Sequence, residues 1–321
     1  MLQKIKMRFF LIFFFMAVSI LHGEEAITYF SSGGRFGDQL LAYLHAKWFS
    51  YKYDIPLLYK PSYYLSGLNL DSVEKHFENQ PFKEEIEVKS LSSFLPKDDN
   101  RSILYICNHF PETPYERDIQ KTTLSIDWKD EGFRSLVKGL LTPKKELKLI
   151  QPKSGCINVA LHLRIGRLYD PIYSNQCFPL KFPDYSYYTE ALKKVISCFE
   201  GKPIYCFIFT DDLYLSMFMS KFTDEIKNKE VIFDYRKEGF YYENVLEDFF
   251  SFFNFDVLIR PDSYFSIIPS LLNDYAIVIA PKTFHRKMCD VIIDEFDISI
   301  NEKLYQKLKQ RPCPVINACS K

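Results

Sequence analysis

From residue 156 onward, short apolar runs alternate with longer amphipathic segments. The runs predict strands over residues 157–163, 204–209, 230–233, 256–259 and 276–280. The segments between them predict helices over about 185–199, 212–221, 244–254 and 264–272. Because strands that alternate with helices build a parallel sheet with helices on its faces, the second half of the chain is expected to be a Rossmann-like unit.

Polar side chains follow the first two of these strands. His162 and Arg164 stand at the end of the first, and Thr210, Asp211 and Asp212 stand at the end of the second. Ligands of parallel α/β sheets bind at this edge, and a guanidinium is suited to phosphate. The pattern predicts a shared crevice with Arg164 as a phosphate-binding residue. The alternative is a surface arginine that pairs with a nearby carboxylate.

The first half of the chain opens with a strand, a glycine-rich turn and a helix. Residues 26–30 predict the strand, the turn is Ser-Ser-Gly-Gly-Arg-Phe-Gly at residues 31–37, and the helix is expected to begin near Asp38. Such a loop before a helix N-terminus suits an oxygen-rich group. Since the loop is not GxGxxG, the alternative is a simple tight turn.

The rest of the first half is less regular. Strands are expected over residues 56–59 and 103–107 and a helix over residues 131–141, whereas residues 60–100 are polar and irregular. The sequence Pro-Lys-Ser-Gly at residues 152–155 predicts a linker. A chain of 321 residues is long for one core, so two domains are expected.

Charge excludes one class of partner. Lys plus Arg and Asp plus Glu both number 41, so no overall field attracts nucleic acid. An anionic ligand must therefore be bound by local groups, and we expect no nucleic-acid partner.

The N-terminus has the pattern of a targeting segment. Lys4, Lys6 and Arg8 precede an apolar run over residues 9–21 that only Ser19 interrupts. This run is shorter than the roughly 18 residues that a spanning helix needs. We therefore expect a signal peptide or a short signal-anchor over residues 1–23, with membrane association through this segment as one outcome.

The eight cysteines show no metal-binding spacing. There is no Cys-x-x-Cys and no clustered histidine, so no metal is predicted. Cys206, within a predicted strand, is expected to be a small buried hydrophobe, and Cys313 and Cys319 could form a disulfide. The phenylalanine-rich residues 249–255 are expected to form a buried helix face.

Several short motifs occur in a fixed order along the chain. They are Gly-Arg-Phe-Gly-Asp-Gln-Leu (34–40), His-Leu-Arg-Ile-Gly-Arg (162–167), Tyr-Tyr-Thr-Glu-Ala (187–191), Phe-Thr-Asp-Asp (209–212), Glu-Asp (247–248), Asp-Ser-Tyr-Phe-Ser (262–266) and Ile-Ala-Pro-Lys (279–282).

This series resembles the α-1,2-fucosyltransferases (glycosyltransferase family 11-like) and, more distantly, the wider GDP-fucose-dependent group. The family's motifs read G-x-x-G-N-Q, H-x-R-R-G-D, Y-Y-x-x-A, a Ser- or Thr-led double aspartate, E-D, N-S-S-F-S and I-A-P-K. The resemblance covers most of residues 27–284. The chain departs from it with Asp38 in place of asparagine, Ile165 in place of the second arginine and Arg167 in place of aspartate.

The resemblance implies a GT-B-like α/β fold: two Rossmann-type domains whose parallel sheets face a central cleft. Residues 24–152 would form the acceptor-side domain, residues 153–300 the GDP-sugar-binding domain, and residues 301–321 a C-terminal helix and tail. The implied location is the membrane or the lumen of the secretory pathway, Golgi-like in a eukaryote. In a bacterium the alternative is the cytoplasmic face of the inner membrane.

The implied activity is inverting, metal-independent transfer of fucose from GDP-fucose to a glycan hydroxyl, α-1,2 to galactose, with no cofactor. The changes at Ile165 and Arg167 leave two alternatives open: an inactive relative that binds glycan or nucleotide, and a transferase for another GDP-sugar. An unrelated Rossmann-type enzyme is a third.

The resemblance also assigns residues. Arg164 and Ser266 are suited to stabilise the leaving β-phosphate, and His162 and Asp248 are implied to face guanine and ribose. Asp248 could instead be a solvated helix residue, and Ser263 only a helix cap. Asp170 and Asp38 are candidates for the general base. Further donor-site residues are Gly166, Thr210, Asp211, Asp212, Ser263 and Phe265, and the glycine loop contributes Gly34, Gly37 and Gln39.

Overall fold

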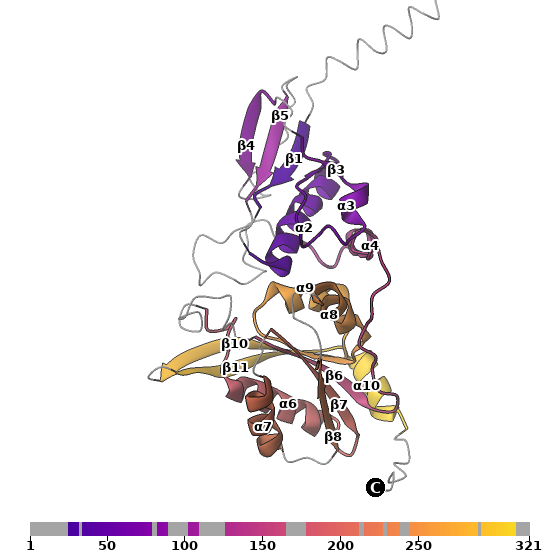
Figure 1. Ribbon diagram of the computed structural model, residues 1–321, viewed down its shortest axis with the longest axis vertical. Coiled ribbons are helices and arrows are strands. Elements are labelled where there is room, and N and C mark those ends of the chain that lie inside the picture. The colour runs from indigo at the N-terminus through magenta and orange to yellow at the C-terminus, as the bar shows by residue number, and fades with distance from the viewer. Residues whose placement is uncertain are drawn as a thin grey trace, which may run out of the picture. The chain divides into compact units, whose positions relative to one another are not determined.

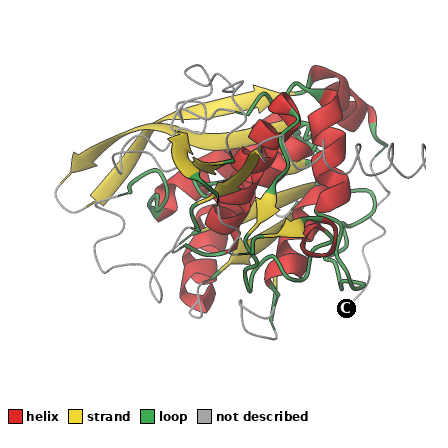
Figure 2. Cartoon of the chain, turned by 90° about the horizontal axis from the view of Figure 1, so that it is seen from above, coloured by secondary structure: helices red, strands yellow, loops and turns green. Residues whose placement is uncertain are grey.

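The computed structural model describes residues 25–31, 34–78, 82–88, 102–108, 126–164, 178–211, 215–226, 230–237, 244–287 and 290–312. Helices and strands are mixed throughout this part of the chain (Figure 2). The described residues fall into two compact units, one that extends to Lys144 and one that begins at Lys145.

The first unit is built on parallel strands and one long helix. In its three-stranded sheet, β5 lies between β1 and β4 and pairs in parallel with both. The helix α2 packs against β1 and β5 and buries Leu40, Leu41, Leu44 and Trp48. The elements are β1 (Glu25–Tyr29), α2 (Phe36–Tyr53), β2 (Leu58–Tyr59), α3 (Leu70–Val73), β3 (Lys75–His76), β4 (Glu84–Val88), β5 (Ile103–Cys107) and α4 (Glu131–Leu140).

Most predicted elements of this unit are confirmed within a few residues, but the expectation for residues 60–100 was wrong in part. That segment contains α3, β3 and β4. The strand β4 has the sequence Glu-Glu-Ile-Glu-Val and is an edge strand, with Glu85 and Glu87 exposed. Its glutamates have low strand propensity, so the sequence pattern concealed it.

The second unit contains a six-stranded sheet in the order β11-β10-β9-β6-β7-β8. All neighbours are parallel except β10 and β11, which are antiparallel. From β8 to β10 the sheet therefore follows the strand order of a Rossmann fold, with the topological switch point between β6 and β9. Its strands are β6 (Ile157–Leu163), β7 (Ile204–Thr210), β8 (Val231–Tyr235), β9 (Val257–Ile259), β10 (Ile277–Lys287) and β11 (Asp290–Ile300).

Helices cover both faces of this sheet. One face of β6 packs with α6 and α7 in a cluster that includes Leu161 and Leu163. On the other face Ala160 clusters with Phe252 and Phe255, and α8 and α9 lie on that side of the sheet (Figure 1). Since all seven residues of β6 are buried, the strand reads as a continuous apolar run. The helices are α6 (Tyr185–Cys198), α7 (Leu215–Ile226), α8 (Val245–Ser251), η2 (Phe252–Asn254), α9 (Tyr264–Leu272) and α10 (Glu302–Gln310).

Two differences from the predicted elements stand out. The strand expected over residues 276–280 continues to Lys287 and forms a hairpin with β11, which was not predicted. The phenylalanine-rich segment is helical as expected, but its last turn is the 3₁₀ helix η2; Phe249, Phe252 and Phe255 are buried.

The end of α10 is tied to the beginning of the sheet. Arg311 donates to the carbonyl of Cys156 at 2.8 Å and to Asp256 Oδ1 at 3.2 Å. Asp256 Oδ2 in turn accepts the backbone amide of Asn158, at 2.9 Å. The segment after α10 thereby joins the amino-terminal ends of β6 and β9.

The predicted targeting segment, residues 1–23, lies outside the described residues. Within the described ranges, no helix is long and apolar enough to cross a membrane. Cys107, Cys156, Cys198 and Cys206 are free thiols, and Cys206 is fully buried as predicted. The other cysteines, Cys177, Cys289, Cys313 and Cys319, also lie outside the described residues.

Candidate functional site

Two arginines flank the switch point of the second unit. Leu161 of β6 and Ile259 of β9 are register partners, so Arg164 and Arg260 follow directly on neighbouring strand ends. Consecutive tyrosines of α6 bind both backbones: the amide of Arg164 donates to the Tyr188 hydroxyl at 3.1 Å, and the Tyr187 hydroxyl donates to the Arg260 carbonyl at 2.6 Å. The motif at residues 187–191 therefore shapes the edge where a ligand is expected.

Arg164 is held in place by three groups. Its Nη1 donates to Asp211 Oδ2 at 2.9 Å, and its guanidinium carbon lies 5.4 Å from the ring centre of Phe182. With its amide bound by Tyr188, the residue is 9 % exposed. This is not the surface ion pair that the alternative interpretation proposed, because cation and carboxylate are both largely buried. A guanidinium has five N–H donors, so it can bind a phosphate oxygen while it keeps Asp211.

His162 is joined to Ser266 across 104 residues of sequence. The two side chains are 2.7 Å apart (Nδ1 to Oγ) and both are buried. The Ser266 Oγ also lies 3.2 Å from the Ser263 carbonyl oxygen, so it bridges this carbonyl and the imidazole. Phe252 and Phe265 contact the imidazole edge to face, with centroids 5.9 and 5.6 Å away.

Ser263 occupies the N-cap position of α9, in line with the alternative that it is only a helix cap. Its side chain makes no capping hydrogen bond, however, and it is 5 % exposed. Its carbonyl oxygen instead accepts from the amides of Ser266 and Ile267, both at 2.9 Å. Ser263, Phe265 and Ser266 of one motif are thus brought together with His162 of another.

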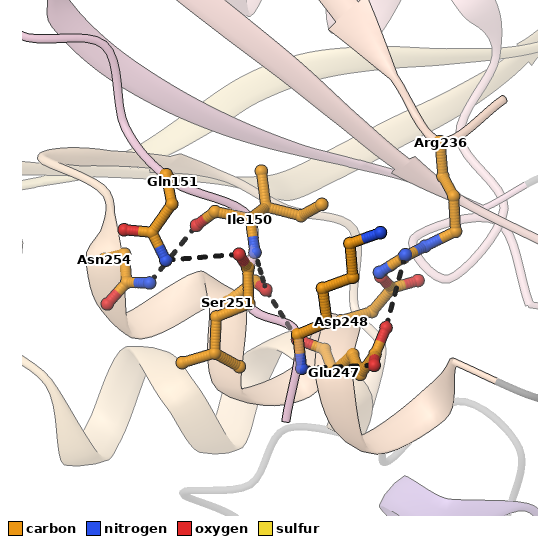
Figure 3. A network of polar contacts seen from close by, with 9 residues as sticks. Ile150, Gln151, Arg236, Glu247, Asp248, Ser251 and Asn254 are labelled. Atoms are coloured by element: carbon orange, nitrogen blue, oxygen red, sulfur yellow. Dashed lines mark hydrogen bonds and ion pairs between the residues drawn. The ribbon is translucent and has the colours of Figure 1, made fainter. Parts of the chain in front are cut away.

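Asp248 is not a solvated helix residue. Its side chain is 13 % exposed and receives Nε and Nη2 of Arg236 on Oδ1, at 3.1 and 2.6 Å (Figure 3). Burial raises the pKa of Asp248 to about 6, although the hydrogen bonds and charge of Arg236 act in the opposite direction. Asp248 is therefore a carboxylate at neutral pH that titrates in a mildly acidic range.

The helix that carries Asp248 also binds the segment that begins the second unit. The amide of Lys148 donates to Glu247 Oε1 at 3.2 Å, and the amide of Ile150 donates to Ser251 Oγ at 2.8 Å (Figure 3). Asn254 donates to the carbonyl of Ile150 at 3.2 Å. These bonds fix α8 and η2 to residues 148–150, and the Glu247 carboxylate also pairs with Arg236.

Other predicted donor-site residues are placed only in part. Thr210 ends β7, and Asp211 follows it and pairs with Arg164. Gly166, Asp170 and Asp212 lie outside the described residues, as do the departures Ile165 and Arg167.

The glycine loop belongs to the first unit. A Cβ on Gly34 would lie 2.4 Å from Asp38 Oδ2, so the absence of a side chain lets the carboxylate pack against the backbone. Gln39 donates to the Gly34 carbonyl at 3.1 Å, and Gly37 is buried in the first turn of α2. Within residues 34–39 the motif thus binds its own backbone, and Asp38 is half-exposed; Ser32 and Gly33 lie outside the described residues.

Three residues of the site were not assigned to it from the sequence, although Tyr188 belongs to the motif at residues 187–191. Arg236 binds Asp248, Phe182 lies against Arg164, and Tyr188 orders the Arg164 backbone. Arg236 could have been found, because it directly follows β8 just as Arg164 directly follows β6. No cluster of three or more His, Cys, Asp or Glu residues suited to a metal occurs among the described residues.

The strand order, the helix layers and the polar residues at the switch point together define an α/β fold with parallel sheets. In sequence, no protein-family model matches the chain, and no curated protein matches it. Solved structures are similar to it at low identity. A mutant of FUT1 from Arabidopsis thaliana in complex with GDP is 9% identical, covers 86% of this chain and 75% of that chain, and has a TM-score of 0.52.

Two further structures are similar at lower TM-scores. NodZ alpha-1,6-fucosyltransferase co-crystallized with GDP is 12% identical, covers 87% of this chain and 99% of that chain, with a TM-score of 0.49. POFUT1 in complex with GDP-fucose is 13% identical, covers 79% and 95%, and has a TM-score of 0.43. The similarity to FUT1 shows the fold, and the predicted GT-B-type α/β class with parallel sheets is confirmed.

Proposed function

We propose that the chain is a glycosyltransferase that uses GDP-fucose and transfers fucose to a glycan hydroxyl with inversion and without a metal. The observation that carries the proposal is Arg164: a buried arginine at the switch point of a Rossmann-ordered sheet, held by Asp211, Phe182 and Tyr188. Support comes from the ordered motif series and from the shared fold with FUT1, which was solved with GDP.

The residues suit the chemistry. In an inverting transfer, the acceptor oxygen bonds to the sugar's C1 while the bond from C1 to the β-phosphate oxygen breaks, and the phosphate keeps the electron pair. The guanidinium of Arg164 stabilises the negative charge that builds on this oxygen. Asp211 keeps the guanidinium in place. Ser266 is fully buried and its Oγ contacts His162 Nδ1 and the Ser263 carbonyl, so its proposed part is to hold the His162 ring beside Arg164.

Asp248 is proposed to bind the guanine base of GDP-fucose. A carboxylate accepts both N–H donors of the guanine edge, and Phe265, which contacts Phe249 beside Asp248, also contacts His162. Ring contacts thereby connect the neighbour of Asp248 on α8 with His162 on β6. Asp170 and Asp38 stay the candidates for the base that takes the acceptor proton, and the first unit is proposed to serve the acceptor.

Calorimetric titration of the whole chain with GDP, with and without a chelator, tests the donor site. We expect micromolar affinity that the chelator does not change and that Arg164→Ala weakens by roughly 30-fold or more, because a buried charged partner is lost. Arg134→Ala removes an arginine of similar exposure that pairs with Glu131 on α4, and it should bind GDP like the wild type. Absence of GDP binding to the folded wild type would refute the proposal.

A transfer assay determines which GDP-sugar is the donor and which glycan is the acceptor. We propose fucose over other GDP-sugars and α-1,2 linkage to galactose, in line with the motif series. Rates of hydrolysis and of transfer from GDP-fucose and GDP-mannose to a galactoside measure the donor preference directly, and the linkage is read from the product. Tight GDP binding with no transfer from either donor would favour the inactive, ligand-binding relative instead.

The proposed location is the membrane or the secretory lumen, or the cytoplasmic face of the inner membrane in a bacterium. Protease protection of the chain in sealed membranes distinguishes these compartments. Protection from external protease, lost on addition of detergent, is expected for a lumenal enzyme.

A further inference from the structure

The proposed guanine-binding site contains a partly buried ion pair, Arg236 with Asp248, to which the proposed transfer reaction gives no role. Arg236, directly after β8, places Nε and Nη2 on the same oxygen of Asp248 and its Nη1 3.3 Å from Oε2 of Glu247 (Figure 3). The side chain of Arg236 is 22 % exposed and that of Asp248 13 %. Because both bonds to Asp248 end on Oδ1, the carboxylate can be held while its other oxygen receives a ligand.

We infer that Arg236 is a positioning residue for base selection: by keeping Asp248 a carboxylate, it makes this subsite prefer guanine to adenine. The inference rests on the proposed function, in which Asp248 receives the base. Arg236 itself need not touch the nucleotide.

Guanine and adenine differ in the hydrogen-bond donors and acceptors that their pairing edges present. The pairing edge of guanine presents two adjacent N–H donors, which a carboxylate can accept. The pairing edge of adenine presents a ring-nitrogen acceptor beside an amino donor. A protonated carboxyl, with one O–H donor and one acceptor oxygen, matches adenine instead. The protonation state of one side chain therefore decides which base is bound better.

The surroundings of Asp248 place this choice close to neutral pH. Burial raises its pKa to about 6, Glu247 on the same helix adds to this, and Arg236 lowers it. Within the described residues these two are the charged groups that act on Asp248, and its neighbour Phe249 is contacted by the rings of Phe250, Phe253 and Phe265. Loss of the Arg236 charge removes the opposing contribution, so Asp248 would hold its proton at neutral pH.

The test is the ratio of GDP to ADP affinity as a function of pH. Titration calorimetry on the whole chain gives both dissociation constants between about pH 5.5 and 8.5. The terminal phosphate of each nucleotide titrates near pH 6, but this contribution cancels in the ratio. The variants are Arg236→Met, Arg236→Lys as the charge-conserving rescue, and Arg134→Met as the matched control away from the site.

We expect the wild type to prefer GDP, with a preference that falls as the pH drops through about 6, the pKa of Asp248. Arg236→Met should lower the preference at neutral pH by roughly 10- to 100-fold and regain it as the pH rises. Arg236→Lys should retain most of the preference, and Arg134→Met should match the wild type at every pH.

A second variant covers the case in which Arg236→Met does not fold. Asp248→Asn cannot ionise, so its GDP preference should be low and independent of pH. An Arg236→Met protein with the wild-type preference at every pH would overturn the inference while leaving the proposed function intact. A wild-type preference that is constant down to pH 5.5 would overturn it as well. A wild type that binds neither nucleotide would instead refute the proposed function.

Discussion

Replacement of Asp248 by asparagine should give a stability difference that depends on pH, with a sign set by burial. The structure raises the pKa of this carboxyl from the ordinary 3.8 to about 6, so the folded protein binds the proton more tightly than the unfolded chain. The stability that this proton provides is complete below the ordinary pKa and is lost as the pH rises through about 6.

The magnitude follows from the two pKa values. Their difference is about 2, and each pKa unit corresponds to about 1.4 kcal/mol, which gives about 3 kcal/mol. The free energy of unfolding of the wild type should therefore fall by about 3 kcal/mol relative to Asp248→Asn between about pH 4 and pH 7.5. The subtraction removes the titration of every carboxyl that the two proteins share.

Urea unfolding at a series of pH values measures this difference. Both tryptophans, Trp48 and Trp128, lie in the first unit, so their fluorescence reports that unit and should not change on substitution. Far-UV circular dichroism includes the second unit and should carry the effect. If the wild type instead kept or gained stability relative to Asp248→Asn as the pH rises, Arg236 would outweigh burial and the pKa of Asp248 would not be raised.

Two further substitutions, one in each unit, test contacts described above. Tyr188→Phe removes the acceptor of the Arg164 amide; it should cost roughly 1–3 kcal/mol of stability, and GDP titration should show weaker binding with the enthalpy change most affected. Gly34→Ala places a Cβ against Asp38 and should destabilise the first unit by roughly 1–3 kcal/mol, seen as an earlier transition in tryptophan fluorescence; an unchanged midpoint would show that the Asp38 side chain moves aside freely.

Central strands could be predicted from the sequence because burial on both faces leaves a continuous apolar run. This holds for β6 and β7, whose residues are almost all buried. The edge strands β4 and β11 contain three acidic residues of five and four of eleven, as suits an exposed edge, and both strands were missed. The edge strands β1 and β8, with more apolar sequences, were predicted, so the acidic residues of β4 and β11 rather than the edge position alone concealed them.

The candidate site divides in the same way. His162, Arg164 and Asp211 could be found because they end predicted strands, a property of local sequence alone. The contacts between such residues could not be predicted, since the pairing of His162 with Ser266 depends on how α9 packs over β6. Arg236 was overlooked for a smaller reason: the predicted strand ended at residue 233, whereas β8 extends to Tyr235 and delivers the arginine.

The contact between Arg311 and the carbonyl of Cys156 sets a condition on biosynthesis. The two residues are 155 positions apart, and a ribosome that adds about 5–20 residues per second needs about 8–30 s to make the intervening chain. Throughout that time β6, the first strand of the six-stranded sheet, has been made without the guanidinium that later joins it to Asp256. The second unit should therefore complete its folding only after synthesis of α10, and until then the nascent chain is a substrate for chaperones.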